Sequence, residues 1–189
     1  LHTLRSKGID VKLLVELGLF GYLPPPGQPF LVSVRGMGSC PMLTDTLGIL
    51  GLVANNTRML ACISAGQIDK CGNINSTKIG DFFLFGSGGA NDVSTAAKEV
   101  IVTLPHDIRR LVEEVSYVTC PGRKVKKIIT DRAMFEKVED EFVLKKIYVG
   151  EDDSMEEAVS AVLASMGWDP RISEELVPLE EPLREEIML

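Results

Sequence analysis

Short apolar segments rich in β-branched residues alternate with helical patterns along this chain, and this alternation constrains its fold more than any other feature. Strands are expected over residues 11–15, 30–34, 59–64, 81–85, 100–104, 126–130 and 142–149. Helices are expected over residues 42–52, 93–100 and 154–166. The alternation predicts an α/β fold with an open, mainly parallel sheet flanked by helices.

The size of the chain predicts how many domains it forms. Its 189 residues, 45% of them hydrophobic, suffice for one substantial core, so we expect a single domain over residues 1–189. Residues 170–189 are acidic and contain proline, which indicates an acidic C-terminal extension at the surface. The chain begins at Leu1, and we expect it to be a processed, cloned or partial piece of a longer polypeptide.

Charge and hydropathy exclude several kinds of partner. A net charge of −7 argues against nucleic acid and against an anionic membrane surface. The longest apolar run is interrupted by Glu16 and ends at Pro24, so it is shorter than the ~20 residues of a membrane-spanning helix. The four cysteines are irregularly spaced and the chain has two histidines, which predicts no metal site and reduced thiols in a cytoplasm.

A glycine-rich sequence, GSGGAND, joins an expected strand to an expected helix at residues 86–92. Gly86, Gly88 and Gly89 let the backbone approach a ligand, and N–H groups at the start of a helix can bind an anion or an oxyanion. A tight turn without a ligand explains the same residues equally well. The spacing of neither a dinucleotide-binding loop nor a P-loop is present.

Glu16 is the one charged residue in the apolar sequence LLVELGLFGYL. A carboxylate surrounded by Leu, Val and Phe loses hydration unless it is paired, protonated or used in chemistry. A buried ion pair is the commoner explanation, and a catalytic role is the other.

The remaining polar candidates have simpler explanations. His106 could be a general base, but no acid partner is evident, so a structural histidine is expected. Cys40 and Cys120 each precede a proline and are expected to be small apolar residues rather than nucleophiles. The basic cluster is expected to be a solvated face, with polyanion contact as an alternative; its members are Arg123, Lys124, Lys126 and Lys127.

Several motifs, in this order, resemble those of family I coenzyme A transferases. The segment VELGLFG is similar to the S-E-N-G-type segment of that family, and AGQIDKCGNINST is similar to its Q-V-D-x-x-G-N-x-N loop. GSGGANDV resembles its G-x-G-G-A-x-D segment, and VIVTLPH and KKIITDRAMF continue the match. The likeness runs from about Val11 to about Trp168 and is closest to β subunits of the glutaconate or 3-oxoacid type.

The resemblance implies a mechanism and a set of residues. Glu16 would be the nucleophile that forms a glutamyl-CoA thioester, and its apolar neighbours would strip water from it. Backbone N–H groups of the glycine loop would bind the oxyanion or CoA, through Gly86, Gly88, Gly89 and Ala90. Carboxamides would contact substrate, namely those of Gln67, Asn73 and Asn75.

The resemblance also implies partners. A homologous α subunit would complete the enzyme, acyl-CoA and a carboxylic acid would be its substrates, and no cofactor would be needed beyond coenzyme A as a substrate. Two departures from the family are a Val before Glu16 in place of Ser, and the lack of the usual first βα unit. Within the same fold, a CoA-ester hydrolase, a ring-opening enzyme or a decarboxylase is an alternative, and a non-catalytic subunit is another.

Overall fold

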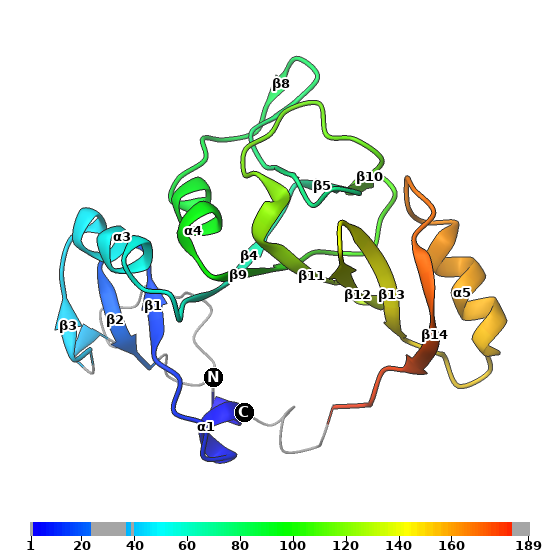
Figure 1. The fold of residues 1–189 in the computed structure, drawn as a ribbon, viewed down its shortest axis with the longest axis horizontal. Helices are drawn as coiled ribbons and strands as arrows, with labels where there is room; N and C mark the ends of the chain where they lie inside the picture. The colour runs from blue at the N-terminus through cyan, green and yellow to red at the C-terminus, as the bar shows by residue number, and fades with distance from the viewer. Residues whose placement is uncertain (1, 24–36, 39, 183–189) are drawn as a thin grey trace. The chain divides into compact units, whose positions relative to one another are not determined.

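The computed structural model describes residues 2–23, 37–38 and 40–182, and the chain divides into two compact units (Figure 1). One unit is Leu1–Asn55 together with Glu180–Leu189, and the other is Asn56–Leu179. Both lie within the single domain predicted over residues 1–189, which stays a prediction. The strand expected over residues 30–34 lies outside the described residues.

The first unit contains a small antiparallel sheet. In it β2 (Leu19–Tyr22) lies between β1 (Leu13–Val15) and β3 (Met42–Leu43). Helix α1 (His2–Ser6) precedes the sheet and α3 (Thr46–Ala54) follows it. The helix expected from residue 42 therefore begins four residues later, because Met42 and Leu43 pair with β2.

Helix α3 begins where the sequence places a capping residue. The side chain of Asp45 accepts a hydrogen bond from the N–H of Gly48 at 2.7 Å, which satisfies one donor of the first helical turn. Ile49 and Val53 of α3 are buried, as are Leu19 and Tyr22 of β2. The apolar interior of this unit is thus supplied by the sheet and by α3.

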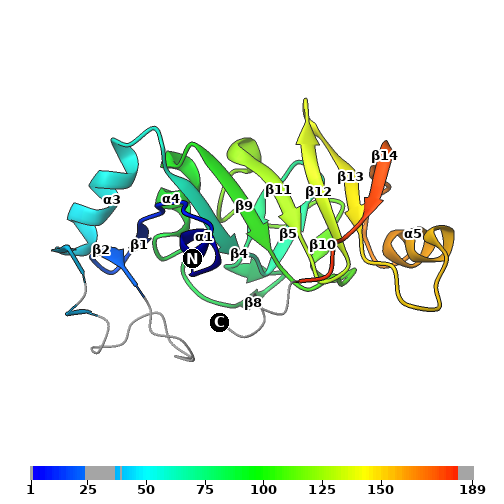
Figure 2. The same ribbon diagram turned by 90° about the horizontal axis from the view of Figure 1, so that it is seen from below.

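The second unit is built on a six-stranded sheet, whose strands lie side by side in Figure 2. From edge to edge they are β14 (Arg171–Pro178), β13 (Glu141–Ile147), β12 (Ala133–Val138), β11 (Val125–Ile129), β9 (Glu99–Thr103) and β4 (Leu60–Ser64). The pairs β14–β13, β11–β9 and β9–β4 are parallel, and the two pairs formed by β12 are antiparallel. The predicted α/β fold with a mostly parallel sheet is confirmed.

One side of this sheet carries further elements of the second unit. Helix α4 (Ala90–Ala96) and a small sheet lie on the same side of it (Figure 1). The small sheet consists of β10 (Leu111–Val112), β5 (Gln67–Asp69) and β6 (Ile74–Asn75). Ile68, Ile74 and Leu111 join the core formed by the central strands. Helix α5 (Met155–Leu163) lies beside β14 in both views.

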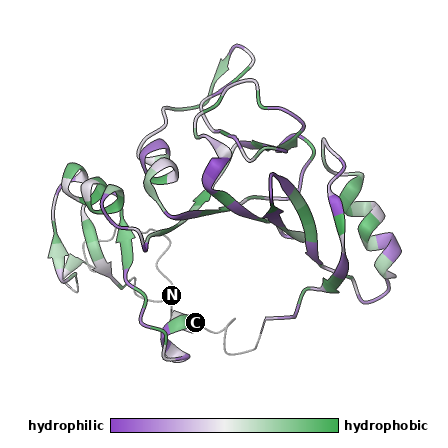
Figure 3. Ribbon diagram, viewed as in Figure 1, coloured by the Kyte–Doolittle hydropathy of each residue, from purple (hydrophilic) through white to green (hydrophobic). Residues whose placement is uncertain are grey.

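A short hairpin projects from the second unit just before α4. It consists of β7 (Lys78–Ile79) and β8 (Phe82–Phe83), and Figure 3 shows hydrophobic residues on it. Phe82, Phe83 and Phe85 are 69%, 64% and 63% exposed, respectively. The strand expected over residues 81–85 is therefore a two-residue strand with solvent around its aromatic rings.

Other elements differ from the sequence prediction in extent. Helix α4 begins at Ala90 instead of Val93. It ends at Ala96 instead of Val100, because Glu99 and Val100 pair with neighbouring strands as part of β9. β1 is half-buried, whereas a buried strand was expected. Part of the predicted acidic extension is instead the edge strand β14, which pairs with β13 and leaves most of its residues exposed.

Among the described residues, no helix is both long enough and apolar enough to span a membrane.

Candidate functional site

Glu16 lies in a tight turn between β1 and β2 of the first unit. The N–H of Gly18 donates to the carbonyl oxygen of Val15 at 3.0 Å and closes the turn. Gly18 has a φ of +111°, and a Cβ there would overlap the carbonyl oxygen of Thr44, so only glycine fits. The N–H of Thr44 donates to the carbonyl oxygen of Gly18 at 2.9 Å, which holds the turn against the start of α3.

The carboxylate of Glu16 is exposed to solvent. Leu17 beside it is 55% exposed, and Leu14 and Val15 are half-buried. The expectation that apolar neighbours strip water from Glu16 is therefore wrong for these residues, because the turn directs Glu16 and Leu17 outward. Glu16 forms no ion pair with any described residue, so the expected structural ion pair is not seen either.

The glycine loop, residues 86–89, leads from the hairpin into α4 of the second unit. Gly88 has a φ of +52°, and a Cβ on Gly86 or Gly88 would meet nothing within 4 Å. The N–H of Ala90 donates to the carbonyl oxygen of Ser87 at 3.1 Å, so the expected role of Ala90 as an oxyanion donor is not supported. The N–H groups of Gly88 and Gly89 donate to no acceptor among the described residues. Two backbone donors are thus available in an open loop.

Asn75 was expected to contact substrate, but it is fully buried and its carboxamide is saturated by the protein. Its Nδ2 donates to the carbonyl oxygen of Lys78 at 2.6 Å and to Oε1 of Gln67 at 3.2 Å. Its Oδ1 accepts from the N–H groups of Thr77 and Lys78, each at 3.1 Å. Asn75 therefore shapes the start of the hairpin and leaves no group for a ligand.

Gln67 and Asn73, the other two expected substrate contacts, also have partners within the protein. The Nε2 of Gln67 donates to the carbonyl oxygen of Arg109 at 3.0 Å. The Nδ2 of Asn73 donates to Oδ2 of Asp69 at 3.1 Å, and its Oδ1 accepts from the N–H of Gly122 at 2.9 Å. These contacts do not support a substrate role for either carboxamide.

Asp69 is a structural residue that sequence reasoning missed. It is 2% exposed, and its Oδ1 accepts from the N–H groups of Cys71 and Asn73, each at 2.9 Å. An aspartate that accepts from the N–H two residues later is typical of an Asx turn. In the sequence, Asp69 with Gly72 three residues later could have indicated this turn.

His106 has a structural environment, as its sequence context indicated. It is 9% exposed; its Nε2 donates to the carbonyl oxygen of Val162 at 3.0 Å, and its Nδ1 lies 3.1 Å from Oγ1 of Thr130. Burial lowers the pKa of His106, with Arg132 as a lesser cause in the same direction. It therefore holds α5 against the sheet.

Cys40 and Cys120, the two thiols that precede a proline, are both at least partly buried. Cys120 is buried, and burial raises the pKa of its thiol, so it is a poor nucleophile. Cys40 is half-buried. Among the described residues, no cluster of His, Cys, Asp and Glu side chains is arranged to hold a metal ion.

Two members of the basic cluster have partners. The Nζ of Lys124 donates to the carbonyl oxygen of Ala97 at 2.7 Å, at the C-terminal end of α4. The Nζ of Lys127 lies 3.7 Å from Oε1 of Glu136. Arg123 and Lys126 are exposed. Only two of the four cations in this cluster are therefore exposed, which leaves a smaller surface for a polyanion than the sequence indicated.

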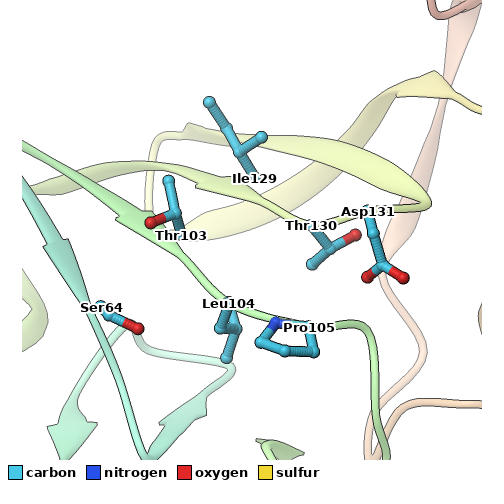
Figure 4. A pocket seen from close by; sticks show the side chains of 7 residues that line it. All are labelled: Ser64, Thr103, Leu104, Pro105, Ile129, Thr130 and Asp131. Atoms are coloured by element: carbon cyan, nitrogen blue, oxygen red, sulfur yellow. The ribbon is translucent and has the colours of Figure 1, made fainter. Parts of the chain in front are cut away.

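A depression of about 580 Å³ lies at the carboxyl ends of β4, β9 and β11 (Figure 4). Its lining consists of Ser64, Thr103, Leu104, Pro105, Ile129, Thr130 and Asp131. The hydroxyl groups of Ser64 and Thr103 have no hydrogen-bond partner among the described residues, whereas Oδ1 of Asp131 accepts from the N–H of His106 at 2.7 Å. Sequence reasoning missed this depression; its signal was the shared carboxyl edge of three expected strands.

Comparison with known proteins identifies relatives of this chain. No family model matches it. It is 33% identical over 123 residues to the B subunit of glutaconate CoA-transferase from Acidaminococcus fermentans, covering 60% of this chain and 46% of the relative. It is 28% identical over 205 aligned positions to the B subunit of 3-oxoadipate CoA-transferase from Pseudomonas knackmussii, covering 94% of this chain and 75% of the relative. The first match therefore spans about half of its relative.

Solved structures share the fold. The structure of glutaconate coenzyme A-transferase from Acidaminococcus fermentans matches with a TM-score of 0.83 and 27% identity, over 95% of this chain and 76% of that chain. The decarboxylase AibA/AibB matches with a TM-score of 0.81 and 18% identity, over 95% of this chain and 75% of that chain. At 18% identity, the match to the decarboxylase shows a shared fold and nothing about function.

Proposed function

We propose that this chain, which is similar to the B subunits of CoA-transferases, is one subunit of an enzyme that transfers coenzyme A from an acyl-CoA to a carboxylate. The match to the glutaconate enzyme over 95% of the chain, at a TM-score of 0.83, carries the proposal. An exposed carboxylate at Glu16 and an open glycine loop supply groups suited to that chemistry. A cytoplasmic location, where acyl-CoA substrates are available, stays a prediction.

In the proposed reaction Glu16 is the nucleophile. Its carboxylate attacks the thioester carbonyl of acyl-CoA, which forms a mixed anhydride and releases CoA thiolate. The thiolate then attacks the glutamyl carbonyl, which forms a glutamyl-CoA thioester and releases the donor carboxylate. An acceptor carboxylate repeats both steps in reverse, which frees Glu16 and forms the new acyl-CoA. No cofactor takes part, and coenzyme A is a substrate.

The exposure of Glu16 affects how this reaction would be protected from water. An anhydride in open solvent hydrolyses, so the site must be covered before the chemistry begins. In the proposal the bound acyl-CoA and a second subunit exclude water from Glu16. The relatives are the B or beta subunits of their enzymes by name, which supports a homologous α subunit as that partner.

The glycine loop would stabilise the negative oxygen that forms when the thioester is attacked. The N–H groups of Gly88 and Gly89 are the proposed donors, since neither is used within the described protein. The backbone at Gly86 borders open space, since a Cβ there would meet nothing within 4 Å, and the CoA chain is proposed to lie in that space. Gln67, Asn73 and Asn75 are left out of the site because their carboxamides hold the protein together.

A trapping experiment tests the proposal. The complex that this chain forms with its native partner is incubated with acyl-CoA and no acceptor, and then treated with borohydride, which reduces a glutamyl thioester to an alcohol. Mass spectrometry should locate the reduced side chain at Glu16, and Glu16→Gln should trap nothing. Glu151→Gln, at another exposed glutamate, should trap as much as the unchanged chain. Normal CoA transfer by Glu16→Gln would refute the role of Glu16.

A decarboxylase or a CoA-ester hydrolase is the alternative within the same fold, and the likeness to a solved decarboxylase is one of fold alone. A decarboxylase or a CoA-ester hydrolase would turn over an acyl-CoA without labelling Glu16. A non-catalytic subunit would show neither label nor turnover that depends on this residue. The trapping experiment therefore separates all three alternatives from transfer.

A further inference from the structure

We propose that Thr119 is a positioning residue for CoA transfer, because it holds both ends of the segment that carries the glycine loop. The inference rests on the proposed function. It concerns residues 78–90, which contain the β7–β8 hairpin and the glycine loop and are named here the hairpin-loop segment. Thr119 lies outside this segment and is 4% exposed.

The hydroxyl of Thr119 holds the first end of the hairpin-loop segment. Its Oγ1 accepts from the N–H of Ser76 at 2.9 Å and donates to Oγ1 of Thr77 at 2.9 Å. The carbonyl oxygen of Thr77 in turn accepts from the N–H of Leu84 at 2.7 Å, across the base of the hairpin. The Thr119 hydroxyl, together with the carboxamide of Asn75, thus fixes the residues from which the hairpin starts.

The backbone of Thr119 holds the other end. Its carbonyl oxygen accepts from Nδ2 of Asn91 at 2.7 Å, within the first turn of α4. Ser94, which is 1% exposed, donates from its Oγ to the carbonyl oxygen of Asn91 at 3.1 Å and so stiffens that turn. The residue that anchors the hairpin therefore also anchors the helix that follows the glycine loop.

Thr119 is itself fixed to the core. Its N–H and that of Cys120 donate to the carbonyl oxygen of Ile74, at 2.8 and 3.0 Å. Ile74 is 1% exposed and belongs to the main hydrophobic core. The two ends of the hairpin-loop segment are thus tied to a rigid point.

Little else holds the glycine loop. Among the described residues, the hydrogen bonds of residues 85–88 stay local: the N–H of Ala90 donates to Ser87, and Oγ of Ser87 donates to the carbonyl oxygen of Gly88. Gly86 and Gly88 have no side chain to pack. The direction of the free N–H groups of Gly88 and Gly89 therefore depends on how the two ends are held, and a donor displaced by about 1 Å costs on the order of 10²-fold in rate.

The test compares Thr119→Val, which removes the hydroxyl at nearly constant volume, with Thr119→Ser, which keeps it, in the assembled complex. Asn91→Ala removes the contact at the other end. Thr119→Val and Asn91→Ala should each lower kcat by roughly 10- to 100-fold with little change in KM for acyl-CoA, and Thr119→Ser should restore most of the rate. Ser165→Ala and Asn55→Ala, which remove local bonds to carbonyl oxygens of α5 and α3, should leave kcat unchanged.

Hydrogen exchange supplies a readout that does not need catalysis. Thr119→Val should speed amide exchange in residues 77–93 by about tenfold and leave exchange in β9 and β11 unchanged. Equal kcat for Thr119→Val and the unchanged chain, equal losses in Thr119→Val and Thr119→Ser, or faster exchange throughout the unit would each overturn the positioning role. If the unchanged complex transfers no CoA while exchange responds as expected, the proposed function fails and the anchoring contact stands.

Discussion

Asn73 and Asp69 are joined by two hydrogen bonds, from the N–H of Asn73 to Oδ1 of Asp69 at 2.9 Å and from Nδ2 of Asn73 to Oδ2 of Asp69 at 3.1 Å. The Oδ1 of the Asn73 carboxamide accepts from the N–H of Gly122 at 2.9 Å. A Cβ on Gly122 would overlap the backbone of Gly72, so the two segments touch backbone to backbone. Asn73 thus joins two loops that lie far apart in the sequence.

The first prediction concerns the stability that Asn73 contributes. Asn73→Ala leaves the N–H of Gly122 without a partner and removes the side-chain hydrogen bond to Oδ2 of Asp69, so the free energy of unfolding should fall by about 1–3 kcal/mol. Urea unfolding measures this. Asn56→Ala is the control, since exposed Asn56 accepts one local bond from Arg58 and its loss should change stability by less than about 0.5 kcal/mol. Equal effects of the two substitutions would contradict the structural role of Asn73.

The second prediction concerns the turn that carries Glu16. Gly18→Ala places a Cβ on a residue with a φ of +111° and against the carbonyl oxygen of Thr44, so it should destabilise the first unit by about 1–3 kcal/mol. Gly51→Ala is the matched control. A Cβ on Gly51, inside α3, would meet nothing within 4 Å, and alanine should raise stability by about 0.5–1 kcal/mol. Thermal unfolding of both variants checks the opposite signs.

The third prediction is a pH dependence from His106. Burial lowers the pKa of this histidine in the folded protein, against the raising effects of its bond to Val162 and of Asp131. The unfolded chain, with a pKa of about 6.5, then binds a proton before the folded chain does. Stability is therefore complete above about pH 6.5 and falls as the pH drops from there toward the lower folded pKa.

Stability measured between about pH 5 and pH 7.5 tests this effect of His106. His106→Gln should flatten the decline below about pH 6.5, although it lowers stability overall, because no group at that position then gains a proton on unfolding. His2→Gln, at the other histidine of the chain, should leave the decline in place. An equally steep decline in His106→Gln would show that another group titrates.

The central strands could be predicted from sequence because they are short apolar segments rich in β-branched residues, which suit a buried sheet. Val100 and Val102 of β9 are fully buried while Ile101 between them is half-buried, and Val125 and Ile128 of β11 are likewise buried. β12, with the sequence AMFEKV, was not predicted, since alanine, glutamate and lysine are poor strand formers. It is a strand because β11 and β13 pair with it on both sides, which local sequence does not reveal.

The candidate site was only partly predictable for a similar reason. The glycine loop and the end of the strand before Glu16 depend on residues close in sequence, and both were predicted. The exposure of Glu16 was not, because apolar neighbours in sequence need not be neighbours in space once Gly18 closes a turn. The structural roles of Asn73 and Asn75 depend in part on partners such as Gly122, which lies 49 residues from Asn73.

The last prediction asks whether the glycine loop acts in catalysis or is only a turn. Gly88 has a φ of +52° and Gly80, at the tip of the hairpin, has a φ of +58°. A Cβ on either would meet nothing within 4 Å, so alanine at each position creates the same backbone strain, about 1 kcal/mol, without a clash. The two substitutions therefore differ only in where the backbone must shift.

If the N–H groups of Gly88 and Gly89 stabilise the oxyanion, Gly88→Ala should turn them away and lower kcat of the assembled complex by about 10²-fold or more. Gly80→Ala should lose a similar amount of stability and keep its kcat within about twofold, since Gly80 contributes no group to the proposed reaction. Steady-state kinetics with acyl-CoA and a carboxylate, together with thermal unfolding of both variants, separate the two effects. Equal kcat in the two variants would mean that the loop is a turn, and the oxyanion donors would then have to be sought elsewhere in the complex.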